Sequence, residues 1–142
     1  MGAAFQIQDD LISILSDDYA KSRGILAEDI HEGKKSLMVI NSYYGDKQSQ
    51  EKKDRLVEIL NMRTTDEDII REACGYLHES GSVEYAQKFA RQMIAEAWSD
   101  LREGLPENTP NAKQAKQQLE ILSAYMVNRK LWARPGKLNK TW

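Results

Sequence analysis

Two adjacent carboxylates, Asp9 and Asp10, are the residues of this chain whose types and spacing best suit chemistry. They lie in an apolar N-terminal stretch whose hydrophobic residues recur with the period of a helix. At about 100° per residue, this helix places both carboxylates on one stripe with Gln6, Ser13 and Asp17. Its other side is apolar and carries Ala4, Ile7, Leu11, Ile14 and Leu15, with Phe5 and Ile12 on the flank. We therefore expect a largely buried helix that lines a cavity with a narrow polar strip.

The polar strip is acidic and contains no basic residue. A solvated helix face usually pairs Lys with Glu four residues apart, and unpaired like charges are unfavourable until a cation neutralises them. Oxygen ligands that leave most coordination positions open suit Mg²⁺, which keeps waters and takes phosphate oxygens. The sequence has no Cys/His cluster that would indicate zinc. A solvent-exposed polar face is the alternative interpretation.

Basic residues follow the acidic strip and could complete an anion site. Lys34 and Lys35 come directly after Gly33, and Lys21 and Arg23 lie in the segment before them. Cations near a metal-bound diphosphate would neutralise a multiply charged leaving group.

Helical spacing continues through the rest of the chain, and no strand pattern competes with it. We expect an all-α protein of about six helices, with the first helix over 2–15 and a loop over 16–33. The further helices are expected over about 34–44, 49–60, 64–79, 82–103 and 111–132. A capping box at 64–67 and a cap at Ser82 would begin two of them. On the last helix we expect four buried residues, which are Ala115, Leu119, Leu122 and Met126.

Composition is consistent with one soluble domain but does not narrow the function. The chain has 142 residues, 41% of them hydrophobic and 30% charged, and a formal net charge of -2, which gives no reason to expect nucleic acid as a partner. The sequence contains neither an apolar run long enough to span a membrane nor a secretion signal. Cys74 is the single cysteine, which excludes an internal disulfide and fits a reducing compartment. We therefore expect a cytoplasmic protein.

Two segments resemble a known family in both order and spacing. Residues 4–12 (AFQIQDDLI) and 28–37 (EDIHEGKKSL) closely resemble the second aspartate-rich motif and the following DI-x-E-GK segment of the trans-isoprenyl diphosphate synthases. This family includes the farnesyl and geranylgeranyl diphosphate synthases. The similarity continues more loosely to about Leu131. It implies the isoprenoid synthase helical-bundle fold, built around a central cavity.

The resemblance also implies an activity and roles for single residues. The family condenses isopentenyl diphosphate with an allylic diphosphate, using Mg²⁺ held by two aspartate-rich motifs. By motif position, Asp9 would be the principal magnesium ligand and Asp10 would support it directly or through water. Gln6 would lie beside the allylic diphosphate, and Lys34 would bind the diphosphate. The family also has a lysine shortly before the DI pair, and Lys21 would take that role if the loop carries a short insertion.

The chain departs from the family pattern in two ways. The motif is usually DDxxD, whereas this chain has Ser13 at the position of the third acid, where its hydroxyl could hydrogen-bond a coordinated water. Family members are also about twice as long, and the part that this chain lacks carries the first DDxxD motif and the isopentenyl diphosphate site. We interpret residues 1–133 as the C-terminal half of a synthase domain and residues 134–142 as a basic tail.

An incomplete site predicts a partner. The apolar side of the first helix needs covering on nearly every side, and an exposed apolar patch of that size marks an interface. We expect a split or heteromeric enzyme in which a partner chain contributes the first DDxxD motif; an excised fragment is the other explanation of the length. A non-catalytic regulatory subunit of a synthase and a helical interaction module remain alternative functions.

His31 and His78 lie too far apart in sequence to indicate a metal site, and whether His31 approaches the substrate is left open.

Overall fold

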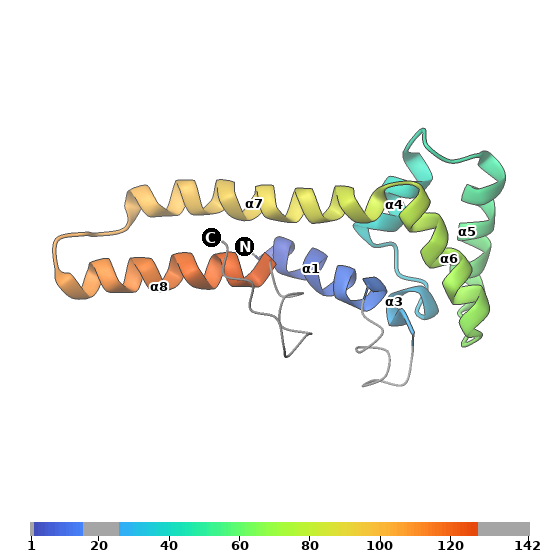
Figure 1. Cartoon of the computed structure of the whole chain (residues 1–142), viewed down its shortest axis with the longest axis horizontal. Helices are drawn as coiled ribbons and strands as arrows, with labels where there is room; N and C mark the ends of the chain where they lie inside the picture. Colours follow the sequence, from blue (N-terminus) through green and yellow to red (C-terminus); the bar gives the residue numbers. More distant parts are fainter. Residues whose placement is uncertain (1, 16–25, 128–142) are drawn as a thin grey trace, which may run out of the picture.

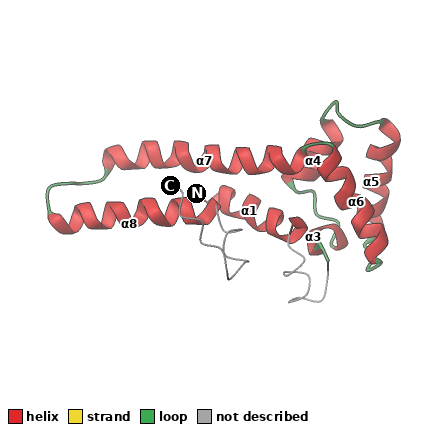
Figure 2. Cartoon of the chain, in the orientation of Figure 1, coloured by secondary structure: helices red, strands yellow, loops and turns green. Residues whose placement is uncertain are grey.

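The structure is a computed structural model that describes residues 2–15 and 26–127. The described residues form seven helices and no strand (Figures 1 and 2), which confirms the all-α prediction. The helices are α1 (Gly2–Leu15), α3 (Glu28–His31), α4 (Leu37–Tyr44), α5 (Gln50–Met62), α6 (Glu67–Glu79), α7 (Ser82–Gly104) and α8 (Pro110–Val127). Lys21, Arg23, Asp17 and the basic tail lie outside the described residues.

The two longest helices, α7 and α8, form an extended antiparallel hairpin (Figure 1). Helix α1 packs against the N-terminal half of α7 and lies nearly in line with α8. Helices α4, α5 and α6 gather around the end where α7 begins, and the short α3 contacts α1, α5 and α6. The two segments that resemble the family motifs, α1 and the α3–α4 connection, are therefore neighbours.

Polar side chains explain where several helices begin. Ser49 caps α5, and the Asp66 carboxylate accepts hydrogen bonds from the backbone N–H groups of Asp68 (3.0 Å) and Ile69 (3.3 Å) at the start of α6. The cap of α6 is therefore Asp66 and not Thr64, the first residue of the predicted capping box. Helix α4 begins at Leu37, three residues later than predicted, because Ser36 takes the capping position.

The predicted cap at Ser82 is wrong. Gly81 occupies the capping position of α7 with a left-handed φ of 72°, which suits a residue without a Cβ. Ser82 is the first residue of the helix, and its buried hydroxyl donates instead to Asn41 Oδ1 (3.0 Å). A buried hydroxyl needs a partner, and the side chain of Asn41 on α4 supplies one that the local sequence could not reveal.

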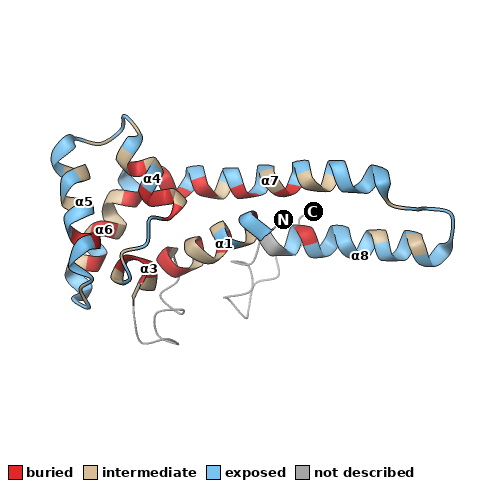
Figure 3. Ribbon diagram, turned by 180° about the vertical axis from the view of Figure 1, so that it is seen from behind, coloured by how far each residue is buried: buried red, intermediate tan, exposed pale blue. Residues whose placement is uncertain are grey.

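The apolar core lies at one end of the molecule, where α1, α3, α4, α5 and α6 surround the start of α7 (Figure 3). Its largest fully buried apolar residues are Leu11, Ile30, Met38, Leu56, Ile59, Ile70, Leu77 and Val83. The apolar side of α1 is covered inside this chain, since Ala4, Leu11 and Ile14 are buried and pack in the two core clusters. Ile7 and Leu15 are partly buried against the same clusters, and Phe5 and Ile12 on the flank are also only partly buried. The centre of this side therefore needs no partner for cover, contrary to expectation.

The hairpin, by contrast, exposes apolar side chains. Leu119 and Leu122 were expected to be buried but are 40% and 54% exposed, and Ala115 is exposed as well. Helix α8 packs on α7 and on the start of α1 along one side, so helical spacing of apolar residues does not by itself provide a covering surface. Met126 lies in the part of α8 whose side chains are not described.

Within the described ranges, we find no helix with the length and apolar character needed to cross a membrane.

Candidate functional site

The polar strip of α1 forms as predicted from Gln6 to Asp10. Gln6 is exposed, Asp9 and Asp10 are half-buried, and the Gln6 side-chain amide donates to Asp10 Oδ1 (3.0 Å). The strip ends earlier than expected, because Ser13 is buried near the end of α1 that packs against α3 (Figure 1). Its Oγ has no hydrogen-bond partner among the described residues. Ser13 therefore does not extend the accessible acidic strip.

A second polar group comes from α3 and the connection that follows it. The predicted loop over 16–33 is interrupted by this helix, and it places Asp29 in a buried position. Asp29 Oδ1 accepts from Lys34 Nζ (2.6 Å), and the backbone N–H of Lys34 donates to the Asp29 carbonyl (2.9 Å). Lys34 Nζ also lies 3.0 Å from a Glu32 carboxylate oxygen. The Asp29–Lys34 segment is thus folded back on itself, with its lysine held by its own carboxylates.

The tight fold of this segment depends on Gly33. Its φ is +68°, in the left-handed region where a Cβ is unfavourable. A Cβ placed on Gly33 would also lie only 2.6 Å from the Leu60 carbonyl oxygen of α5. The family-like glycine is therefore required by two independent features of this backbone.

Electrostatics links the two polar groups. Burial raises the pKa of Asp10, the Gln6 hydrogen bond partly offsets this increase, and the nearby Asp29 carboxylate raises the pKa further. Hydrogen bonds to Asp29 and Glu32 raise the pKa of Lys34, which therefore stays cationic at neutral pH. Two carboxylates from separate segments thus lie close together beside one lysine.

The site is oxygen-rich but incomplete as a metal site. Among residues 2–15 and 26–127, no three His, Cys, Asp or Glu side chains are arranged to hold a metal ion. One buried oxygen, Asp29 Oδ2, has no hydrogen-bond partner in the part of the chain that is described. An all-oxygen donor set with few protein ligands fits Mg²⁺, which retains waters and takes further oxygens from a phosphate group. Asp9 and Asp10 could hold such an ion if water and substrate complete its coordination.

Sequence reasoning selected Gln6, Asp9, Asp10 and Lys34, and the structure brings Asp10 and Lys34 to the same end of α1. It missed Asp29, although this residue lies inside the motif segment. The signal that could have found it is its spacing of five residues before Lys34, which a single helical turn followed by a glycine turn converts into a direct contact.

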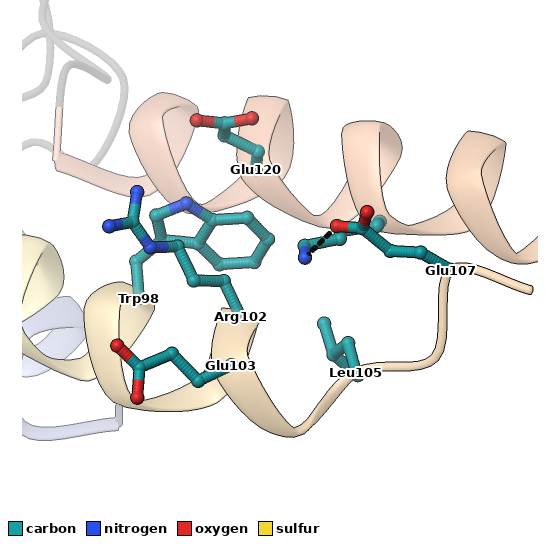
Figure 4. A pocket seen from close by; sticks show the side chains of 7 residues that line it. Trp98, Arg102, Glu103, Leu105, Glu107 and Glu120 are labelled. Carbon is teal, nitrogen blue, oxygen red and sulfur yellow. Dashed lines mark hydrogen bonds and ion pairs between the residues drawn. The ribbon is translucent and has the colours of Figure 1, made fainter.

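A separate cavity of about 530 Å³ lies between the far ends of α7 and α8 (Figure 4). Its walls include the Trp98 indole, the apolar Leu105 and an ion pair between Lys116 and Glu107. These groups are mixed in charge and include no cluster suited to metal or diphosphate binding, so we do not assign the active site to this cavity.

Comparisons with known proteins agree with the two motif segments. Residues 1–77 match the polyprenyl synthetase family model, and the chain belongs to that family. It is 36% identical over 108 residues to a geranylgeranyl pyrophosphate synthase of Apiospora sacchari, covering 76% of this chain and 31% of that protein. It is also 36% identical over 122 residues to a geranylgeranyl pyrophosphate synthase of Aspergillus fumigatus, covering 85% of this chain and 33% of the relative. The matched part of the chain spans about a quarter to a third of the length of the curated relatives that it matches.

Proposed function

We propose that this chain is the C-terminal part of a prenyltransferase that condenses isopentenyl diphosphate with an allylic diphosphate, giving farnesyl or geranylgeranyl diphosphate. The observation that carries this proposal is the meeting of the two motif segments: Asp10 of α1 lies close to Asp29 and Lys34 of the α3–α4 connection. The names of the geranylgeranyl pyrophosphate synthases that it resembles support the same reaction class.

Each polar residue then has a defined role. Asp9 and Asp10 would hold Mg²⁺, which supplies Lewis-acid stabilisation of the departing diphosphate. Lys34 binds diphosphate oxygens as a permanent cation, since two neighbouring carboxylates favour its charged form. Gln6 donates a hydrogen bond to one Asp10 carboxylate oxygen and would lie beside the allylic diphosphate. Lys21, outside the described residues, is proposed as a second cation for the diphosphate.

The remaining ligands would come from a complementary chain that carries the first DDxxD motif. Exposed apolar surface supports such a partner: Tyr85 and Phe89 stack on the outside of α7 with their ring centroids 5.9 Å apart, and Ile121 of α8 is 69% exposed. Apolar surface of this kind is typical of protein–protein interfaces. We propose that the partner is the N-terminal half, or an equivalent subunit, of the synthase, and that the complex is cytoplasmic.

The burial of Ser13 favours a second candidate, a non-catalytic subunit that modulates a complete synthase. The position of the third motif acid is occupied here by a buried hydroxyl without an observed partner, so it supplies no accessible ligand. Such a subunit would retain the fold and the interface but would not require Asp9 for the activity of the complex.

Reconstitution of the complex separates these two functions. The chain is coexpressed with a DDxxD-bearing partner, and the complex is assayed for incorporation of isopentenyl diphosphate into an allylic diphosphate, with and without Mg²⁺. Asp9→Asn is expected to lower kcat/KM by at least about 100-fold, as expected for loss of a ligand that stabilises charge in the transition state. Asp46→Asn, which changes an exposed carboxylate outside the site, is the matched control and keeps full activity. Equal activity of the Asp9→Asn and wild-type complexes would refute the catalytic role and favour the regulatory subunit.

A further inference from the structure

The Lys34 segment is held from the side opposite α1 by the turn between α5 and α6. This turn begins where Arg63 ends α5 in a left-handed conformation with φ of 48°. The Thr64 hydroxyl accepts a hydrogen bond from the Asp66 backbone N–H (3.0 Å), and Asp66 in turn caps α6. The Thr64 carbonyl therefore belongs to a turn whose own geometry is fixed by hydrogen bonds.

His31 connects α3 to this turn. Its Nδ1 lies 2.9 Å from the Thr64 carbonyl oxygen, a contact between residues 33 positions apart in sequence. A carbonyl oxygen can only accept, so Nδ1 must carry the proton and donate it. Two residues later, the Gly33 backbone passes so close to the Leu60 carbonyl that a Cβ would not fit. The segment thus has one polar and one steric contact with the end of α5 and the turn after it.

The His31 and Gly33 contacts both lie within the short segment that sets the position of Lys34. The Gly33 N–H donates to the Ile30 carbonyl (3.0 Å), and the Lys34 N–H donates to the Asp29 carbonyl (2.9 Å), so residues 29–34 form one closed unit. A shift of His31 relative to Thr64 must therefore carry Lys34 with it. The two helices that this turn connects are also held to each other. Arg55 of α5 donates to both carboxylate oxygens of Glu72 of α6, each at 3.0 Å.

We propose that His31 is a positioning residue for diphosphate binding: its hydrogen bond to Thr64 fixes the 29–34 unit so that Lys34 meets the diphosphate. This inference rests on the proposed function, because it assigns to Lys34 a diphosphate ligand. His31 acts through Lys34 and does not itself contact the substrate.

The test uses the full 142-residue chain with two readouts, amide hydrogen exchange at Lys34 and binding of inorganic pyrophosphate with Mg²⁺ by calorimetry. His31→Ala removes one hydrogen bond and is expected to accelerate exchange of the Lys34 amide, and to raise the Kd for pyrophosphate, by about three- to tenfold. His31→Asn presents an amide N–H at the position of Nδ1 and should restore both values. Gln48→Ala removes two side-chain hydrogen bonds elsewhere, one to the Tyr76 carbonyl and one from the Ser42 hydroxyl, and it should change neither readout.

A double-mutant cycle examines whether His31 acts through Lys34. Lys34→Ala removes the cation, so adding His31→Ala to it should weaken pyrophosphate binding no further. Unchanged Lys34 exchange in His31→Ala, unchanged pyrophosphate affinity, failure of His31→Asn to rescue, or additive losses in the cycle would each overturn the positioning role. If the wild-type chain binds no pyrophosphate while His31→Ala still accelerates exchange, the diphosphate role of this link fails and only the structural link is supported; the proposed function is decided separately, by the activity of the reconstituted complex and its Asp9→Asn variant.

Discussion

Gly33→Ala should destabilise this protein strongly although it adds only one methyl group. The left-handed φ of +68° costs an L-residue about 1–2 kcal/mol. The new Cβ would also meet the Leu60 carbonyl oxygen at 2.6 Å, and relieving overlap in a packed region costs about 1–3 kcal/mol. The two costs together predict a loss of about 2–5 kcal/mol in the free energy of unfolding.

Thermal unfolding followed by circular dichroism measures this loss. At about 3 °C per kcal/mol for a chain of this size, the melting temperature should fall by about 6–15 °C. Gly75→Ala is the matched control, because Gly75 lies inside α6 and a Cβ there would meet no atom within 4 Å apart from the backbone of its own helix turn. This control should instead stabilise the protein by about 0.5–1 kcal/mol through helix propensity. A Gly33→Ala protein that melts with or above wild type would refute the proposed geometry of the Lys34 segment.

Three further perturbations test other parts of the structure. Asp66→Ala removes the cap of α6 and should lower the unfolding free energy in urea by about 1 kcal/mol, whereas an unchanged midpoint would contradict the capping role. Burial raises the pKa of the Cys74 thiol to about 11, so at pH 8 it should react with a disulfide reagent far more slowly in the native than in the urea-unfolded chain; equal rates would show that it is accessible. Asp10→Asn should raise the melting temperature without Mg²⁺ at pH 8: burial raises the pKa of Asp10 above its ordinary 3.8, so the ionised group lowers stability above that raised pKa. The gain should disappear near pH 3, where the wild-type carboxyl is protonated in both states, and a gain that is the same at both pH values would contradict this reasoning.

Helix type and approximate length were accessible from local patterns. The first helix ends at Leu15 as predicted, and α5 and α7 begin and end within about two residues of their expected positions. These features depend on side-chain periodicity and on residues that cap or terminate helices, all of which act over a few positions. Contacts over longer separations were not accessible, as the bond from Ser82 to Asn41 shows.

For the site, local sequence determined the membership of the acidic strip, because a helix of fixed geometry necessarily brings Gln6, Asp9 and Asp10 to one side. It also determined that a glycine precedes Lys34. Which carboxylates meet was decided by tertiary packing, since α3 carries Asp29 into contact with Lys34 and close to Asp10. Burial was decided in the same way: α3 and α7 cover α1, whereas the apolar residues of α8 find no equivalent surface in the described chain. Periodicity specifies which residues share a face, but only the neighbouring helices determine what that face contacts.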